Sequence, residues 1–397
     1  MALSEVKYKY HIKMLYDYNG KQLVFDETNI LGFIIDKSYD SLNMPLLYLK
    51  VSLDKRIVNY IYDNRDKKFM TIYIDKFVDS DNKSISISSS YIKDQFMCFV
   101  DANMKSNIDY DYANKDDEKE TVQRIVTIGL MKLDNINNNK KVVTGVYQNE
   151  YIQDILLSEL SVTKLVLEPL GAYNKKVSIN VNNVTTMTKF VKFIADNCGI
   201  YNSSYRLYYG LDKTYLLSSS GKGIPTSDEI YNKIIFNVNK EGKSESSKCE
   251  GMSIDDNAKA YKIDIDESDI KMNQNTGSSK SKNNIVGIDA YGNTKELDIY
   301  NSSDIDTKKK TEVYRMNNLN NINYIKSKVD GNRTYVTIAK SKVDASIFTL
   351  NKEYYVRNHS NANYNGKYII STFQEIYVRN DDSFELNTII KLRKISN

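Results

Sequence analysis

The sequence predicts a mainly β protein with a smaller α/β module, in which two β-barrels flank or enclose the α/β domain. Three observations predict this fold class. Runs with period-two hydrophobicity fill both ends of the chain, two segments with apolar residues at helical spacing lie in the middle, and 397 residues exceed one ordinary core. We therefore expect a first barrel over residues 1–147, an α/β module over 148–237 and a second barrel over 238–397.

The C-terminal end, Ser346–Ile395, is predicted to contain four successive strands that close a barrel built from the preceding chain. Lys367–Val378 and Ser383–Arg393 should form an antiparallel hairpin, because both are rich in β-formers and the polar turn Arg379–Asp382 separates them. A further strand is expected at Glu353–Arg357. One face of the last strand is apolar, since polar residues alternate with Phe384, Leu386, Thr388, Ile390 and Leu392.

The first domain opens with a predicted hairpin. Val6–Tyr18 alternates, Asn19-Gly20 tolerates the positive φ of a tight turn, and Lys21–Phe25 returns. A strand with one apolar face follows over Leu46–Leu53, and Asp54 should cap a short helix. Later in this domain we expect an Asn-rich turn at 135–139, a polar loop at 101–120, and strands at 68–77, 84–90, 96–100, 121–133 and 141–147.

Two helices and a hairpin are predicted for the α/β module. Asn149 can cap a helix that runs to about Leu160, and Thr186 can cap a second helix that ends at Gly199. A tyrosine-rich hairpin should follow over residues 204–217.

A polar insertion at about 242–310 interrupts the predicted second barrel. It is rich in Ser, Lys, Asn, Asp and Gly, which is typical of loops. Arg315–Lys328 carries apolar residues at helical spacing and predicts a helix. Short strands are still expected at 258–265, 285–290, 296–300 and 335–339.

The charge balance argues against a polyanionic partner. Lys and Arg number 55 and Asp and Glu 51, which gives a net charge of +4, so we expect no specific nucleic-acid site. No apolar run approaches the length of a membrane span, and Met1–Tyr10 lacks the apolar core of a secretory signal. We therefore expect synthesis in the cytoplasm and no membrane span.

The chain has few histidines and cysteines from which to build a catalytic or metal site. His11 and His359 are the only histidines, so a catalytic triad or a multi-histidine metal site lacks its residues. Cys98, Cys198 and Cys249 form no C-x-x-C pair and are expected to be small buried side chains. We predict no catalytic residues, no metal site, no cofactor-binding residues and no cofactor.

Two short motifs resemble binding loops but lack the required residues or spacing. Asp79-x-Asp81 begins like a calcium loop, but Lys83 and Ser84 stand where a ligand and a glycine are required. Gly221-Lys222-Gly223 lacks the spacing of a phosphate-binding loop. Neither motif therefore predicts a binding site.

Three carboxylates lie closest to ordered apolar segments: Glu159, Glu168 and Glu375. A glycosidase needs only two carboxylates that its fold brings together, so sequence cannot exclude such a pair. No acid and base signature surrounds any of the three, and we expect solvated or capping side chains.

One order of motifs resembles a known family. The strand Val142–Tyr147 leads through Gln148-Asn149 into a helix with an Ile-Leu core; a second helix then ends in Gly199-Ile200-Tyr201, before the hairpin Tyr205–Leu217. This order resembles the baseplate hub proteins of contractile phage tails and phage-tail-like bacteriocins, which include the late-control protein family and the hub-like part of type VI secretion spikes. The resemblance covers residues 140–220 by motif and the whole chain by element order.

The resemblance implies a structural protein and its partners. In that family three chains form a ring whose two barrels per chain present six similar units to a six-fold tail tube, while the other face carries the spike. The implied partners are a homotrimer, the tail tube protein, the central spike protein, the tape-measure protein and other baseplate chains. The implied location is the tail baseplate of a virion or tailocin particle, after synthesis in the bacterial host cytoplasm.

This sequence departs from the family pattern in two ways. It carries the polar insertion Gly242–Lys310, and it ends at Asn397 with no spike or enzyme appended, so we expect no puncturing or lytic activity. Two other functions stay open on the sequence: a cell-wall glycan hydrolase, which lacks any local acid and base signature, and a carbohydrate- or receptor-binding tail protein. Tyrosine-rich strand faces could stack on sugars, but subunit interfaces use tyrosine equally well.

Overall fold

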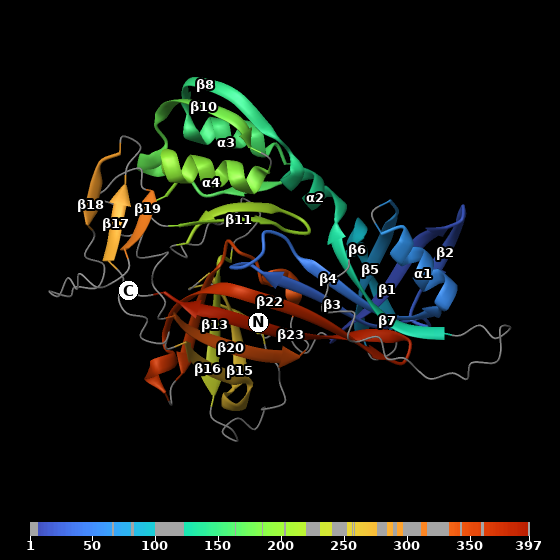
Figure 1. Ribbon diagram of the computed structural model, residues 1–397. Helices are drawn as coiled ribbons and strands as arrows, with labels where there is room; N and C mark the ends of the chain where they lie inside the picture. Colours follow the sequence, from blue (N-terminus) through green and yellow to red (C-terminus); the bar gives the residue numbers. More distant parts are fainter. Residues whose placement is uncertain are drawn as a thin grey trace.

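The computed structural model shows a large mixed β-sheet with a smaller α/β module above it and a three-stranded sheet at one side (Figure 1). The large sheet contains 15 strands. The structure describes residues 7–65, 67–80, 83–99, 123–162, 164–184, 186–201, 204–219, 231–239, 252–255, 257, 259–275, 284–288, 292–296, 311–315, 333–341, 344–358 and 361–395.

Eight strands of the large sheet form a closed circuit of antiparallel pairings. The C-terminal strands β22 (Gly366–Asn380) and β23 (Ser383–Lys394) pair with each other, β22 pairs with β3, and β23 pairs with β1 where Tyr10 faces Phe384. Pairing from β3 through β4, β7, β6 and β5 back to β1 completes the circuit. Its other strands are β1 (Lys7–Tyr18), β3 (Ile30–Ser38), β4 (Leu46–Asp54), β5 (Phe69–Ser80), β6 (Lys83–Phe99) and β7 (Gln123–Lys132).

A second set of strands branches from the same hairpin. β22 also pairs with β21, which leads to β13, β15 and β14, and β23 also pairs with β20, which leads to β16. The pairs β21–β13 and β13–β15 are parallel, which makes the sheet mixed. These strands are β13 (Lys233–Asn239), β14 (Met252–Asp255), β15 (Ala260–Asp266), β16 (Ile270–Asn275), β20 (Arg333–Ser341) and β21 (Glu353–Asn358).

The α/β module places two helices beneath a two-stranded ribbon, with β11 between the helices and the large sheet (Figure 1). The ribbon pairs β8 with β10, and β12 pairs with β11 and with β9. The helix α2 (Leu133–Lys140) connects β7 to β8. The remaining elements are β8 (Val143–Tyr151), α3 (Ile152–Leu160), β9 (Leu165–Leu167), β10 (Lys176–Val184), α4 (Met187–Asn197), β11 (Tyr205–Tyr209) and β12 (Thr214–Ser218).

The outlying elements are short. β2 (Lys21–Phe25) forms a hairpin with β1, and α1 (Lys55–Asp63) follows β4. The small side sheet contains β17 (Asn284–Ile288), β18 (Thr294–Glu296) and β19 (Thr311–Arg315). Single-turn 3-10 helices lie at Gly171–Tyr173, Glu267–Asp269, Ala345–Ile347 and Ala362–Tyr364.

Hydrophobic alternation explains the sheet. All five residues predicted for the inner face of the last strand are buried, and so are Leu47, Leu49, Val51 and Leu53 on β4. Burial of each such aliphatic side chain stabilises the fold by about 1.5–3 kcal/mol relative to exposure. The module has its own core, in which Ile155 and Leu156 of α3 pack with Phe190 and Ile194 of α4.

The structure contains the predicted first turn and the predicted ends of α1 and α4. Asn19 and Gly20 adopt φ of 52° and 79° in the first hairpin, and the Asp54 carboxylate accepts a hydrogen bond from the Arg56 amide at 2.8 Å. The Thr186 hydroxyl accepts from the Lys189 amide at 3.2 Å, and Gly199 ends α4 with φ of 81°.

Two predictions at the start of the module are wrong. The Asn-rich segment 135–139 is helical, because Ile136 joins the module core and the buried Asn135 amide donates to the carbonyls of Tyr209 and Gly210, contacts that override a low helix propensity. Asn149 does not cap α3, which begins after Tyr151. Asn149 instead has φ of 57° at an irregularity of the β8–β10 pairing, where asparagine tolerates the left-handed conformation.

Strand assignments also need correction. The predicted strand 84–90 and the described part of the predicted strand 96–100 belong to one strand, β6, whose register against β5 shifts near Asp75. The described residues between 346 and 395 hold three strands rather than four, because the turn Ala345–Ile347 begins this stretch and the strand β20 precedes it. β3 was not predicted. β8 pairs with β10 in the module rather than in the first barrel, and β13 lies in the large sheet rather than the module.

Several predictions fall outside the described residues. These are the polar loop at 101–120, the helix at 315–328 beyond Arg315, most of the insertion at 242–310, and the residues Asp81, Gly221, Lys222, Gly223, Cys249 and His359.

Candidate functional site

Two of the three singled-out carboxylates stabilise the α/β module. Glu159 on α3 accepts a hydrogen bond from the Tyr147 hydroxyl of β8 at 2.8 Å and forms an ion pair with Lys141 at 3.1 Å. Glu168 accepts from both the amide and the hydroxyl of Ser218, at 2.7 and 2.9 Å. Both carboxylates therefore connect elements of the module.

The third carboxylate, Glu375, is fully buried, so the expectation of a solvated or capping side chain is wrong for it. It lies on β22, pairs with Lys37 of β3, and accepts a hydrogen bond from the Tyr377 hydroxyl at 2.6 Å. A buried carboxylate persists only when such partners compensate its lost hydration. With no exposed surface, Glu375 cannot contact a substrate in this structure.

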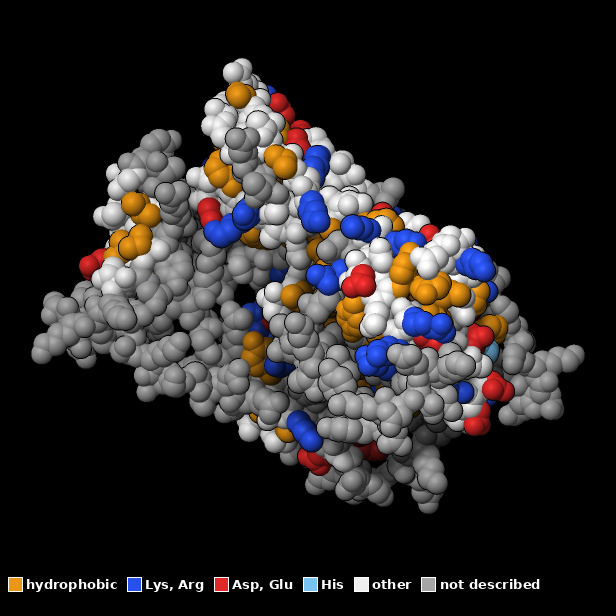
Figure 2. All heavy atoms as spheres, turned by 45° about the vertical axis from the view of Figure 1, so that its right-hand side comes forward, with side chains coloured by type: hydrophobic (Ala, Val, Ile, Leu, Met, Phe, Trp, Pro, Cys, Tyr) orange, Lys and Arg blue, Asp and Glu red, His pale blue; other side chains and the backbone are white. Residues whose placement is uncertain are grey.

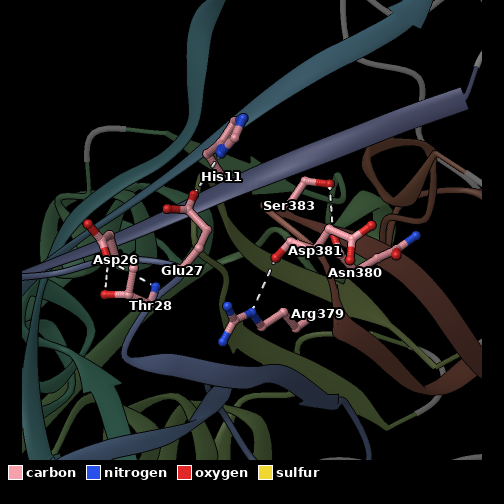
Figure 3. Close-up of polar contacts among 8 residues, drawn as sticks. All are labelled: His11, Asp26, Glu27, Thr28, Arg379, Asn380, Asp381 and Ser383. Carbon is pink, nitrogen blue, oxygen red and sulfur yellow. Dashed lines mark hydrogen bonds and ion pairs between the residues drawn. The ribbon is translucent and has the colours of Figure 1, made fainter.

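His11 lies in a group of short polar contacts that we call the polar rim (Figure 3). Its Nδ1 is 2.7 Å from Glu27 Oε1, and its ring packs edge-on against Phe77 at 4.6 Å. A His–carboxylate pair acts as a general base on a reacting group that lies within hydrogen-bond reach of the imidazole. The other contacts drawn in Figure 3 are local: Thr28 donates to the Asp26 carboxylate, Arg379 to the Asp381 carbonyl, and the Ser383 hydroxyl to the Asn380 carbonyl. The members of the polar rim are His11, Asp26, Glu27, Thr28, Arg379, Asn380, Asp381 and Ser383.

The described part of the chain contains neither a metal-ligating cluster nor a helix that could span a membrane. No group of three or more metal-ligating side chains occurs among those residues. Cys98 and Cys198 are buried free thiols, and burial raises the pKa of Cys98 to about 12. Within the same ranges, no helix has the length and hydropathy required to cross a membrane.

The module meets the large sheet through the hairpin β11–β12, and we call this contact the joint. Arg206 of β11 is 7% exposed and donates from its guanidinium to the carbonyl of Ile370 on β22 at 2.9 Å. The Tyr209 amide donates to the Asn43 carbonyl at 2.7 Å, and the Tyr208 ring packs edge-on against Tyr39 at 4.6 Å. These contacts fix the module directly over the shared strand β22.

Two hollows flank the joint. One has a volume of about 430 Å³ and is lined by Arg206, Arg393 and Asp40 together with hydroxyl-bearing side chains. The other has a volume of about 270 Å³ and is lined mainly by aromatic and aliphatic residues, with Lys37 at its wall. Burial lowers the pKa of the Arg206 guanidinium, although nearby Asp40 opposes this shift.

The surface carries apolar side chains as well as charges. Figure 2 shows patches of hydrophobic side chains between Lys and Arg on one face. On the module, the exposed large apolar residues are Val142, Val146, Tyr151 and Leu157. Exposed apolar side chains of this kind suit contacts with other chains.

Comparison with known proteins identifies the family. A family model described as Bacteriophage PBS1 gene 109 protein matches residues 1–395. The chain belongs to this family. No curated protein matches it.

Solved structures of phage tail proteins resemble the fold of this chain. A tail protein from Neisseria meningitidis MC58 matches with a TM-score of 0.51 at 10% identity, over 97% of this chain and 96% of that chain. The 43 kDa tail protein of prophage MuSo2 from Shewanella oneidensis gives a TM-score of 0.48 at 8% identity, over 96% of both chains. A chain of the lidded PdpA-VgrG complex of Francisella gives 0.49 at 11% identity, over 97% of this chain and 53% of that chain. The resemblance to phage-tail hub proteins is confirmed at the level of fold.

The joint was missed by sequence reasoning. Arg206 is the only charged residue in the strand Tyr205–Tyr209, whose last four residues are all buried, and a charged residue in such a strand is the signal that could have been noticed. Asp40 and Arg393 carried no signal, because a loop aspartate and an arginine on an alternating strand are both ordinary surface residues.

Proposed function

We propose that this member of the gene 109 family is the structural baseplate hub of a contractile tail, a trimeric ring that joins the six-fold tail tube to the central spike. The branching of two strand sets from the single hairpin β22–β23 carries the proposal. The first set closes into a circuit, and the second runs from β14 to β16 without a pairing between these two strands in the described residues. We take the second set as a second barrel unit that the polar insertion interrupts. Three copies of the chain would then present six β units to the tube.

The proposed partners are those that the resemblance to hub proteins implies. Two further copies complete the ring, the tail tube protein binds one face, and the central spike protein binds the other. The tape-measure protein and other baseplate chains complete the surroundings, and the location is the tail of a virion or tailocin particle. The match over 97% of this chain and 96% of a tail protein supports placing the whole chain in one such role.

We also propose that the chain is not an enzyme. Each candidate carboxylate is already engaged by partners inside the fold, Glu375 with no exposed surface at all. A lytic role would require a carboxylate pair open to a glycan strand.

Native mass tests the hub proposal most directly. Light scattering of the purified protein, alone and mixed with its candidate spike, should give about three times the 45.8 kDa chain mass and a stable complex with the spike. A monomer that ignores the spike would contradict the proposal. Glycan-array binding would then support a carbohydrate- or receptor-binding tail protein, and turnover of purified peptidoglycan would support a hydrolase.

A truncation tests the part played by the shared hairpin. Removal of residues 346–397 deletes β21, β22 and β23, which opens the closed circuit and separates the two strand sets. Ring formation should be lost. Trimers that survive this truncation would count against the proposed barrels.

A further inference from the structure

The larger hollow at the joint, which we call the joint cleft, lies where the module meets the loop after β3 and the end of β23. Its volume of about 430 Å³ exceeds that of a single small ion and would hold a short peptide segment. The lining residues come from the loop, the start of α4, β11, β23 and the residues at the open end of the β11–β12 hairpin. They are Tyr39, Asp40, Ser41, Leu42, Asn43, Thr188, Ser204, Tyr205, Arg206, Leu207, Ser219 and Arg393.

The charged groups of the cleft do not balance. Arg206 is 7% exposed, the Arg393 side chain is 15% exposed, and Asp40 is the single carboxylate among the lining residues. Asp40 Oδ2 lies 3.8 Å from Arg393 Nε and accepts the Ser371 hydroxyl at 2.6 Å. Two guanidinium groups thus lie near one carboxylate, and each of the two side chains is largely buried, where an uncompensated charge is costly.

The donors of the cleft are only partly used by the protein. A guanidinium offers five N–H donors in a planar fork that matches a carboxylate. Arg206 donates one of them to the Ile370 carbonyl at 2.9 Å, and the Nε atoms of Arg206 and Arg393 are buried without a hydrogen-bond partner. The neutral part of the wall carries the hydroxyls of Ser204 and Ser219, which are 2.8 Å apart.

Apolar side chains complete the wall. Leu42, Leu207 and the rings of Tyr39 and Tyr205 lie beside the guanidinium groups. A free inorganic anion makes no use of such a surface, whereas the methylene groups of an acidic side chain do. We propose that the joint cleft binds the carboxylate of an acidic peptide segment from a partner chain, with Arg393 and Arg206 as its cationic receptors.

Calorimetric titration of the full chain tests this site. The probes are an acetylated triglutamate peptide, the matched triglutamine peptide and inorganic phosphate. Triglutamate should bind, triglutamine should not, and phosphate should bind more weakly than triglutamate. Binding of triglutamine, or phosphate affinity equal to that of triglutamate, would overturn the proposal, and so would the absence of any triglutamate binding.

Three variants locate the binding in the cleft. Arg393→Gln should weaken triglutamate binding at least tenfold, and Asp40→Asn should strengthen it severalfold because it removes the competing carboxylate. Lys50→Gln removes the same charge from an exposed position on β4 and should leave the affinity unchanged. Equal effects of Arg393→Gln and Lys50→Gln would show diffuse charge attraction and would refute the site. The cleft lies within one chain, so these results do not depend on whether a trimer forms.

Discussion

Lys37 on β3 and Glu375 on β22 form an ion pair across 338 residues of chain. The Lys37 side chain is 14% exposed and that of Glu375 is fully buried, and the Lys37 ammonium also lies over the Phe373 ring at 5.1 Å. The ion pair joins β3, which the sequence did not predict, to β22, which belongs to both the closed circuit and the second strand set.

Removing one member of this pair should be far more harmful than removing both. Lys37→Met leaves the buried Glu375 carboxylate without its counter-charge and should lower the free energy of unfolding by about 3–5 kcal/mol. The double variant Lys37→Met, Glu375→Leu should recover most of this loss. Urea denaturation monitored by circular dichroism measures both, and a double variant no more stable than Lys37→Met would refute the pairing.

Tyr377→Phe should destabilise the protein less than Lys37→Met, because it removes a hydrogen bond to Glu375 and keeps the counter-charge. It removes one donor to Glu375 and leaves Lys37 in place, so we expect a loss of about 1 kcal/mol.

Gly210 should tolerate no side chain. Its amide donates to the Lys213 carbonyl at 2.8 Å, and a Cβ at this position would lie 2.5 Å from the same oxygen. Gly210→Ala should therefore lower the free energy of unfolding by about 1–3 kcal/mol and loosen the joint. Gly145→Ala on β8 is the control, because its nearest contact would be an ordinary 3.6 Å, and it should be neutral or stabilise by up to about 1 kcal/mol. Thermal unfolding of both variants decides the matter.

Asp54 should contribute a pH-dependent cap to α1. Hydrogen bonds from the Arg56 side chain and then from its amide lower the pKa of Asp54. Its contribution to stability is therefore fully present above the unfolded-state pKa and is lost as the pH falls through the lower folded-state value. Asp54→Ala should cost about 1 kcal/mol at pH 7 and progressively less in acid, whereas Asp54→Asn keeps a neutral cap. An Asp54→Ala deficit that is unchanged at low pH would contradict this account.

Cys98 should resist alkylation in the folded protein. Burial raises the pKa of its thiol to about 12 and also raises that of Cys198. At pH 8 the thiolate fraction of Cys98 would be only about 10⁻⁴, and the thiolate is the reactive form. Iodoacetamide labelling followed by peptide mass spectrometry should modify both cysteines only after denaturation. Rapid labelling of either one in the native protein would refute its burial.

The sequence predicted the strands that carry strict alternation and the helices that carry side-chain caps. β23 and β4 alternate without a break, and Asp54 and Thr186 cap their helices by local hydrogen bonds. Such features depend on neighbours within a few positions of the chain, so a sequence pattern is sufficient to find them.

The failures depend on contacts between distant residues. Asn135 is helical because it bonds carbonyls of the β11–β12 hairpin, and Glu375 is buried because Lys37 lies on the adjacent strand. Asn149 lies in a pairing irregularity that exists only opposite β10. The joint was missed for the same reason, since Arg206 acquires its role only when the module packs on β22.

The closure of the strand circuit at Tyr10 opposite Phe384 has a consequence for synthesis on the ribosome. At about 5–20 residues per second, the first strands emerge tens of seconds before their last partners exist. Until β22 and β23 are made, β1 and β3 each lack one neighbour and keep an unpaired edge that can pair with another chain. We therefore expect a nascent chain of this protein to require a holdase until translation ends, and premature termination to yield aggregates rather than a smaller folded domain.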